Sequence, residues 1–147
     1  KALPQARLAG VVRDPMDTCF SNLRTFFTGA AAYSHDQAQL AGHFLRCERL
    51  ARHLHRAMPG RILDVAYGAL VSGAEGGARG VFDFCGLPFA PEALEVGHAL
   101  GDVSTASAVS VREGILRNRG GAWKPYARQL QPMREALEAS RIDVRTP

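Results

Sequence analysis

The 147-residue sequence is 46% hydrophobic and 22% charged, which is enough apolar material for one domain with its own core. Its 18 lysines and arginines against 14 acidic residues leave a net charge of +4, which suits an anionic ligand but is too small to indicate nucleic-acid binding. No apolar run reaches the length of a membrane span and no signal peptide is visible, so we expect a cytoplasmic protein.

The cysteines Cys19, Cys47 and Cys85 lie at wide spacings inside apolar patterns and lack the spacing of metal ligands. We therefore expect reduced core thiols and no metal. The sequence has no initiator methionine and runs almost at once into a buried-type strand. We interpret residues 1–147 as a single domain that is the C-terminal portion of something larger.

The first predicted elements are a strand and two helices. The apolar run Leu8–Val12 is typical of a strand buried on both faces, which we expect over 7–12. Asp14 can cap a helix over 15–28, with Pro15 at its first position. After a loop of small residues, Ser34 or Asp36 can cap a long helix over 36–58.

The sequence after residue 60 predicts one more strand and two more helices. Residues 62–67 form the strand, and a helix over 73–85, weakened by glycines, ends at Gly86. The stretch from 101 is polar and glycine-punctuated, and a helix over 123–137 follows it. Strand, long helix and strand in this order predict a parallel α/β sheet, with the two strands adjacent or nearly so.

Arg13 lies where the first strand ends and the first helix begins. Ligands of α/β sheets bind at the carboxyl ends of the strands, and a helix start beside an arginine favours an anion. Ser21, on the same helix, could offer a hydroxyl to that anion. The alternative is that Arg13 pairs with Asp17 and Ser21 is a neutral helix residue.

Four stretches, in order, resemble the C-terminal half of sulfotransferases that use 3′-phosphoadenosine 5′-phosphosulfate (PAPS). They are VVRDPMDTCFS at 11–21, VAYGALV at 65–71, VFDFCGLPFAPE at 81–92 and STASAVSVREGILRNRGGAWKPYARQL at 104–130. The chain is most similar to the bacterial-type and tyrosylprotein-sulfotransferase-like branch. The resemblance implies a P-loop-NTPase-like fold, a three-layer parallel sheet with flanking helices, incomplete in this chain.

The resemblance also implies a set of cofactor-binding residues and no metal. Arg13 and Ser21 would clamp the 3′-phosphate of PAPS, and Tyr67 would lie near the adenine. Ser107 would return to the nucleotide, and Arg119 or Lys124 would supply charge. The partners implied are the nucleotide, a hydroxyl-bearing acceptor and the upstream N-terminal half of the same protein.

Three positions depart from the family pattern: Thr25 replaces an arginine, Gly68 an acidic residue and Ala122 a basic residue. The glycine-rich loop that binds the phosphosulfate in the family is missing, because SGAEGGARG at 72–80 lacks the lysine and the spacing. None of the five histidines has an evident carboxylate to orient it, so the catalytic base stays unknown.

These observations leave three hypotheses, in order of preference. The first is a PAPS-dependent sulfotransferase, of which this chain is the half that binds the 3′-phosphate and adenine. The second is a catalytically inactive nucleotide-binding or interaction domain of the same ancestry. The third is a nucleic-acid-binding module that uses a row of arginines on the long helix, at positions 46, 49, 52 and 56.

Overall fold

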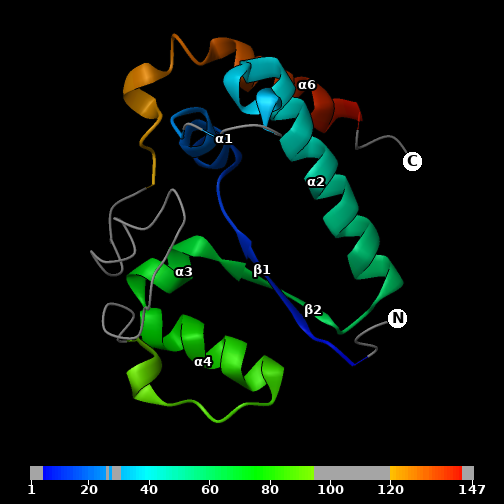
Figure 1. Ribbon diagram of the computed structural model, residues 1–147, viewed down its shortest axis with the longest axis vertical. Helices are drawn as coiled ribbons and strands as arrows, with labels where there is room; N and C mark the ends of the chain where they lie inside the picture. Colours follow the sequence, from blue (N-terminus) through cyan, green and yellow to red (C-terminus); the bar gives the residue numbers. More distant parts are fainter. Residues whose placement is uncertain (1–4, 26, 28–30, 95–119, 144–147) are drawn as a thin grey trace. The chain divides into compact units, whose positions relative to one another are not determined.

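The computed structural model describes residues 5–25, 27, 31–94 and 120–143 (Figure 1). These residues divide into two compact units. Unit 1 consists of Lys1–Arg13 and His55–Arg119, and unit 2 of Asp14–Leu54 and Gly120–Pro147. Ser107 and Arg119, two of the predicted nucleotide-binding residues, lie outside the described residues. None of the described helices combines the length and the apolar character that crossing a bilayer requires.

Unit 1 is built on a two-stranded parallel sheet of β1 (Leu8–Val12) and β2 (Ile62–Ala66). Their register pairs Leu8 with Ile62 and Val12 with Ala66, so the two strands end side by side. The predicted parallel pairing is therefore confirmed, and with it the mixed α/β class of the chain.

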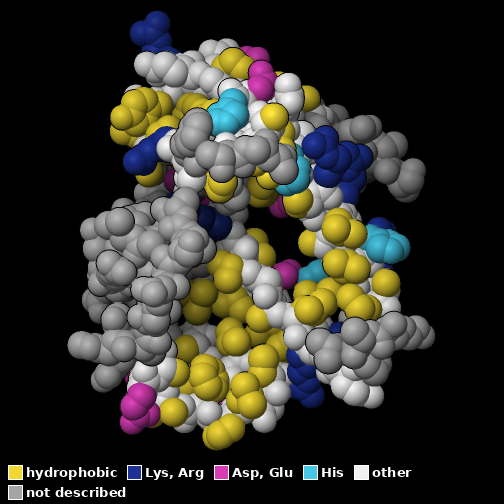
Figure 2. Space-filling view, in the orientation of Figure 1, with side chains coloured by type: hydrophobic (Ala, Val, Ile, Leu, Met, Phe, Trp, Pro, Cys, Tyr) yellow, Lys and Arg dark blue, Asp and Glu magenta, His cyan; other side chains and the backbone are white. Residues whose placement is uncertain are grey.

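Two helices follow β2 in unit 1, where the sequence predicted one. α3 (Tyr67–Ser72) begins directly after the strand, so Tyr67 is the first helical residue and not the last residue of a strand. α4 (Ala74–Cys85) was predicted to within a residue and ends on Gly86, whose φ of 71° places it in the left-handed region that favours glycine. The short 3₁₀ helix η2 (Pro91–Leu94) follows. In Figure 2, hydrophobic side chains form much of the surface over α4 and the residues after it.

The prediction that β1 is buried on both faces is wrong for this chain. Leu8, Val11 and Val12 are 45%, 60% and 50% exposed, whereas Val65 on β2 is buried. The reason is that α3 and α4 pack on β2, whereas the main neighbour of β1 among the described elements is β2 itself, so the faces of β1 are left open there.

Unit 2 is helical. Its helices are α1 (Pro15–Leu23), α2 (Gln37–Ala57) and α6 (Gln131–Asp143), with the 3₁₀ turns η1 (Ala32–His35) and η3 (Lys124–Tyr126) between them. The last residues of α2, from His55, belong to unit 1. The core of unit 2 joins three helices, and its least exposed members include Cys19 from α1, Ala41 from α2 and Met133 from α6.

The caps of α1 and α2 follow the sequence. The Asp14 carboxylate accepts the backbone N–H of Asp17 at 2.9 Å, with Pro15 at the first helical position. Of the two predicted caps of α2, Asp36 fills the role by accepting the N–H of Gln39 at 2.8 Å. The predicted range of α2 is confirmed to within a residue at each end.

Two helices differ from their predicted ranges. α1 ends at Leu23 and not at 28, because the N–H of Thr25 turns to Asn22 while its hydroxyl bonds the carbonyl of Ser21 at 2.9 Å. The last helix begins at Gln131 and not at 123. Pro132 lacks an N–H and is tolerated only in the first turn of a helix, so a helix over 123–137 would have carried it in its interior.

Candidate nucleotide-binding site

Arg13 and Tyr67 are brought together in unit 1. Because Val12 pairs with Ala66, the residue that follows each strand leaves the sheet at the same edge. The Arg13 guanidinium carbon lies 4.7 Å from the centre of the Tyr67 ring, within the range of a cation–π contact. Both side chains are half-buried. The carboxyl edge of this sheet therefore holds a cation that lies over an aromatic ring.

Ser21 and Lys124 belong to unit 2. That they bind the same ligand phosphate as Arg13 therefore stays a prediction. Ser21 is exposed on α1, one turn beyond the buried Asp17. Lys124 follows a glycine turn and begins η3. Its ammonium makes no ion pair or hydrogen bond with any residue that the structure describes.

The sequence departures at two positions now have a local description. Thr25, where the family has an arginine, uses its hydroxyl within α1 and contributes no charge. Gly68 is exposed on α3, and a Cβ added to it would meet no atom within 4 Å. A side chain at position 68 therefore has room, so the absence of an acidic residue there is not imposed by packing.

The link between α1 and the segment before α6 was not visible in the sequence. Asp17 is only 5% exposed, and its Oδ2 accepts the backbone N–H of Gly121 at 2.8 Å. Trp123 packs against the core of unit 2, and the rings of Tyr126 and Phe20 lie 5.3 Å apart. The stretch around Lys124 is thus docked on the helix that carries Ser21.

The expectation that no histidine has a carboxylate beside it is wrong for His55. Its Nε2 lies 3.0 Å from Oδ1 of Asp64, in the middle of β2. His55 lies in the last turn of α2, which belongs to unit 1 together with β2. Since Asp64 precedes the carboxyl end of the strand, this pair joins the last residues of α2 to β2 within unit 1 and does not lie at the strand ends.

The expectation of three core thiols holds only in part. Cys19 is buried, Cys85 is partly buried and Cys47 is exposed. Burial, together with the negative charge of Asp14, raises the pKa of Cys19 to about 12. Cys47 lies in the second half of α2, where the apolar face predicted for the core is exposed, as at Leu50. The arginines at 46, 49, 52 and 56 of this helix are exposed as well.

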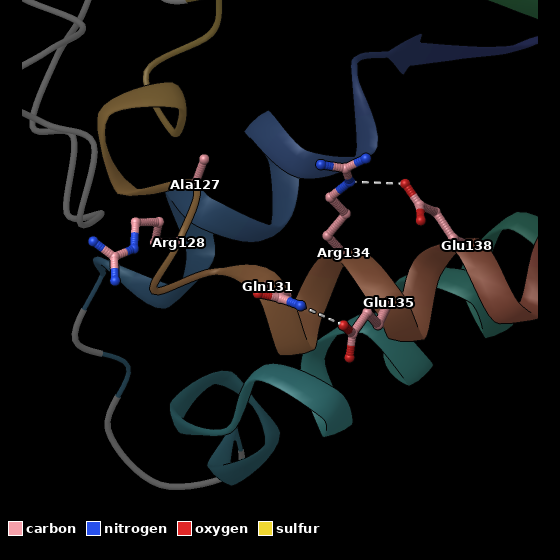
Figure 3. Close-up of a pocket in the computed structure, with 6 residues that line it drawn as sticks. All are labelled: Ala127, Arg128, Gln131, Arg134, Glu135 and Glu138. Atoms are coloured by element: carbon pink, nitrogen blue, oxygen red, sulfur yellow. Dashed lines mark hydrogen bonds and ion pairs between the residues drawn. The ribbon is translucent and has the colours of Figure 1, made fainter.

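Two cavities lie beside α6 in unit 2, and neither contains a predicted nucleotide-binding residue. One, of about 430 Å³, is shown in Figure 3. It is lined by two hydrogen-bonded pairs within the helix, Gln131 with Glu135 and Arg134 with Glu138, and by Arg128. The other, of about 350 Å³, lies between the start of α1 and α6, with Trp123 and Leu137 in its lining. Because cations and anions alternate in the first cavity, it does not suit a phosphate group.

Comparison with known proteins identifies the family. The model of the sulfotransferase family matches residues 1–91, which include both strands, Arg13, Ser21 and Tyr67. A protein of Aquifex aeolicus (strain VF5), described as "Uncharacterized protein", is 31% identical over 139 residues. The match covers 92% of this chain and 18% of that relative, so the chain spans less than a fifth of its length. No solved structure matches the chain. The residues at the carboxyl edge of the sheet thus lie within the matched region, and the chain belongs to the sulfotransferase family.

Proposed function

We propose that this chain binds the 3′-phosphate and adenine of PAPS for a sulfotransferase that acts on a hydroxyl acceptor. Membership of the sulfotransferase family suggests sulfuryl transfer. The observation that carries the proposal is the pairing of Arg13 with Tyr67 at the carboxyl ends of two parallel strands, 4.7 Å from guanidinium carbon to ring centre. Ligands of open α/β sheets bind at this edge.

The residues present fit the nucleotide. A guanidinium offers a planar fork of donors that a phosphate accepts bidentately, and stacking on Tyr67 restricts the orientation of that fork. Since Arg13 covers one face of the ring, Tyr67 would contact adenine through its other face, its edge or its hydroxyl. Ser21 and Lys124 would add a hydroxyl and an ammonium. Ser107 and Arg119 would complete the set.

PAPS would supply the sulfuryl group, which passes to the acceptor hydroxyl in an in-line displacement run mainly by positioning and electrostatics. The residues of this chain would hold the end of the nucleotide remote from the reacting sulfur. Binding energy realised there fixes the sulfuryl group for attack without touching it. The chain would thus act as an anchor for the donor.

We further propose that the chain is the C-terminal half of a P-loop-like sulfotransferase domain of the bacterial-type or tyrosylprotein-like branch. The upstream N-terminal half would supply the loop for the 5′-phosphosulfate and the base for the acceptor. Residues 1–147 by themselves should accordingly show no sulfotransferase activity with any acceptor. Turnover of PAPS and a phenol by this chain would contradict the division into halves.

Calorimetry with adenosine 3′,5′-bisphosphate and adenosine 5′-phosphate tests the anchor. We expect tighter binding of the bisphosphate, and a loss of about 1.5–3 kcal/mol for Arg13→Ala, the contribution of hydrogen bonds to a charged group. Arg13→Lys keeps the charge but loses the fork and the flat stack, so it should recover only part of the affinity. Equal affinity for the two nucleotides in the wild-type protein would refute the role in 3′-phosphate binding.

A catalytically inactive nucleotide-binding domain of the same ancestry is the second candidate. One observation favours it: Thr25, at a position where the family has an arginine, is occupied within α1 and adds no cation. The complete protein distinguishes the two candidates. Bisphosphate binding without sulfuryl transfer to any of a panel of phenols, carbohydrates and tyrosyl peptides would favour the inactive domain.

A further inference from the structure

The turn at 121–124 is held at both of its ends. Gly121 has a φ of 74°, a backbone conformation that favours glycine. Its N–H donates to Oδ2 of Asp17 at 2.8 Å, and its carbonyl accepts the N–H of Lys124 at 3.0 Å. Asp17 itself is fixed, because its own N–H donates to the Asp14 cap. A buried carboxylate on α1 therefore determines where this turn begins.

The side chain of Lys124 folds back over the turn that Asp17 holds. A Cβ added to Gly121 would lie 3.0 Å from Cε, 3.2 Å from Cδ and 3.4 Å from Nζ of Lys124. The ammonium thus lies close above the glycine, and it makes no ion pair within the described part of the chain. Moving Gly121 would move the charge of Lys124 with it.

The burial of Asp17 adds a second argument. An ionised carboxylate is costly to bury unless hydrogen bonds compensate it. Asp17 is 5% exposed, and no hydrogen-bond donor in the described residues reaches its Oδ1. One turn of α1 separates Asp17 from Ser21, so the two residues lie on the same side of the helix. The helix that carries Ser21 therefore also carries the carboxylate that holds the turn of Lys124.

We infer that Asp17 is a positioning residue of the phosphate site. It holds the turn at 121–124 against α1, so that the Lys124 ammonium and the Ser21 hydroxyl serve one anion. Asp17 does not touch the ligand, since its negative charge would repel a phosphate. This inference rests on the proposed function, and it adds a residue to the set that the family resemblance implies.

A double-mutant cycle on the complete protein tests this role, with adenosine 3′,5′-bisphosphate affinity measured by calorimetry. Asp17→Ala should weaken binding by about tenfold, the same loss as Lys124→Ala. The double variant should bind no more weakly than Lys124→Ala, because the carboxylate acts through that lysine. Asp17→Asn should keep most of the affinity, since its amide oxygen can still accept the Gly121 N–H.

Hydrogen exchange of the Gly121 amide provides a readout that does not depend on any ligand. Exchange should accelerate in Asp17→Ala and return towards the wild-type rate in Asp17→Asn. Leu40→Ala removes side-chain volume from the same core on α2 and is the control for lost stability. It should leave the bisphosphate affinity unchanged, and Gly121 exchange should change no more than its loss of global stability accounts for. Unchanged Gly121 exchange in Asp17→Ala, or losses from Asp17→Ala and Lys124→Ala that simply add, would overturn the inference. A wild-type protein that binds no bisphosphate would instead overturn the proposed function.

Discussion

Substitution of Gly121 by alanine separates the backbone cost of the turn from its effect on ligand binding. Gly60, Gly86 and Gly121 have φ angles of 73°, 71° and 74°, so alanine should cost each of them a similar amount. A non-glycine residue in the left-handed region loses about 1–2 kcal/mol. For a chain of this length that corresponds to a fall in melting temperature of roughly 3 °C per kcal/mol.

The three glycines differ in what the new methyl group would meet. At Gly60 and Gly86 it would meet nothing within 4 Å, whereas at Gly121 it would lie 3.0 Å from Cε of Lys124. The far end of a lysine moves at little energetic cost, so stability should fall about equally in all three variants. Only Gly121→Ala, however, displaces the ammonium.

The assay combines thermal unfolding with calorimetry on the three variants. Gly121→Ala should lose bisphosphate affinity towards the level of Lys124→Ala, about tenfold below wild type, while Gly60→Ala and Gly86→Ala bind as wild type does. Wild-type affinity in Gly121→Ala would refute the idea that the turn places Lys124 at the ligand. An equal loss of affinity in all three variants would show that the effect is general destabilisation.

Three further outcomes are expected. Tyr67→Phe should keep the contact with Arg13 and most of the bisphosphate affinity measured by calorimetry, whereas Tyr67→Ala should lose affinity. A larger loss in Tyr67→Phe than in Tyr67→Ala would show that the hydroxyl matters more than the ring. Burial raises the pKa of Cys19 from 9.0 to about 12, so the unfolded chain releases this proton at lower pH than the folded one. The free energy of unfolding should therefore fall between pH 9.0 and about 12, and less steeply in Cys19→Ala, as followed by urea titration at each pH. Val11 is 60% exposed on β1 and leaves an apolar surface that favours self-association. Val11→Lys should therefore shift the 147-residue chain towards monomer in sedimentation experiments. An unchanged distribution of species would exclude this strand as the contact.

Much of the secondary structure could be predicted because its causes are local. Asp14 and Pro15 begin α1 by capping and by the fixed φ of proline, and Gly86 ends α4 because only glycine adopts its conformation easily. Parallel pairing of β1 and β2 follows from a long helix between two short apolar runs. For the caps the determining residues lie within a few positions of the element, and for the strand pair it is the order of elements along the chain that decides.

The errors arise where a local pattern has more than one structural solution. The residues after 123 have a helical period, but Pro125 and Pro132 divide them into a 3₁₀ turn and a later helix. The apolar run of β1 predicts burial. How much of a strand is covered, however, depends on the elements packed against it, which the residues of the strand do not specify. The same holds for Cys47 on α2, which shares the apolar period of the core but is exposed.

The candidate site shows the same division between local and distant causes. The parallel strands that bring Arg13 and Tyr67 to one edge were predicted from the sequence, whereas the contact between the two side chains was not. The hydrogen bond from Gly121 to Asp17 joins residues 104 positions apart, and no periodicity encodes it. The only sign of this bond in the sequence is an acidic residue in the first turn of α1. Because the helix dipole explains such a residue equally well, nothing in the sequence indicates that Asp17 holds a distant turn. A substitution in the turn at 121–124 should therefore act on the same ligand as a substitution in α1, which is why the double-mutant cycle, and not either variant by itself, decides the role of Asp17.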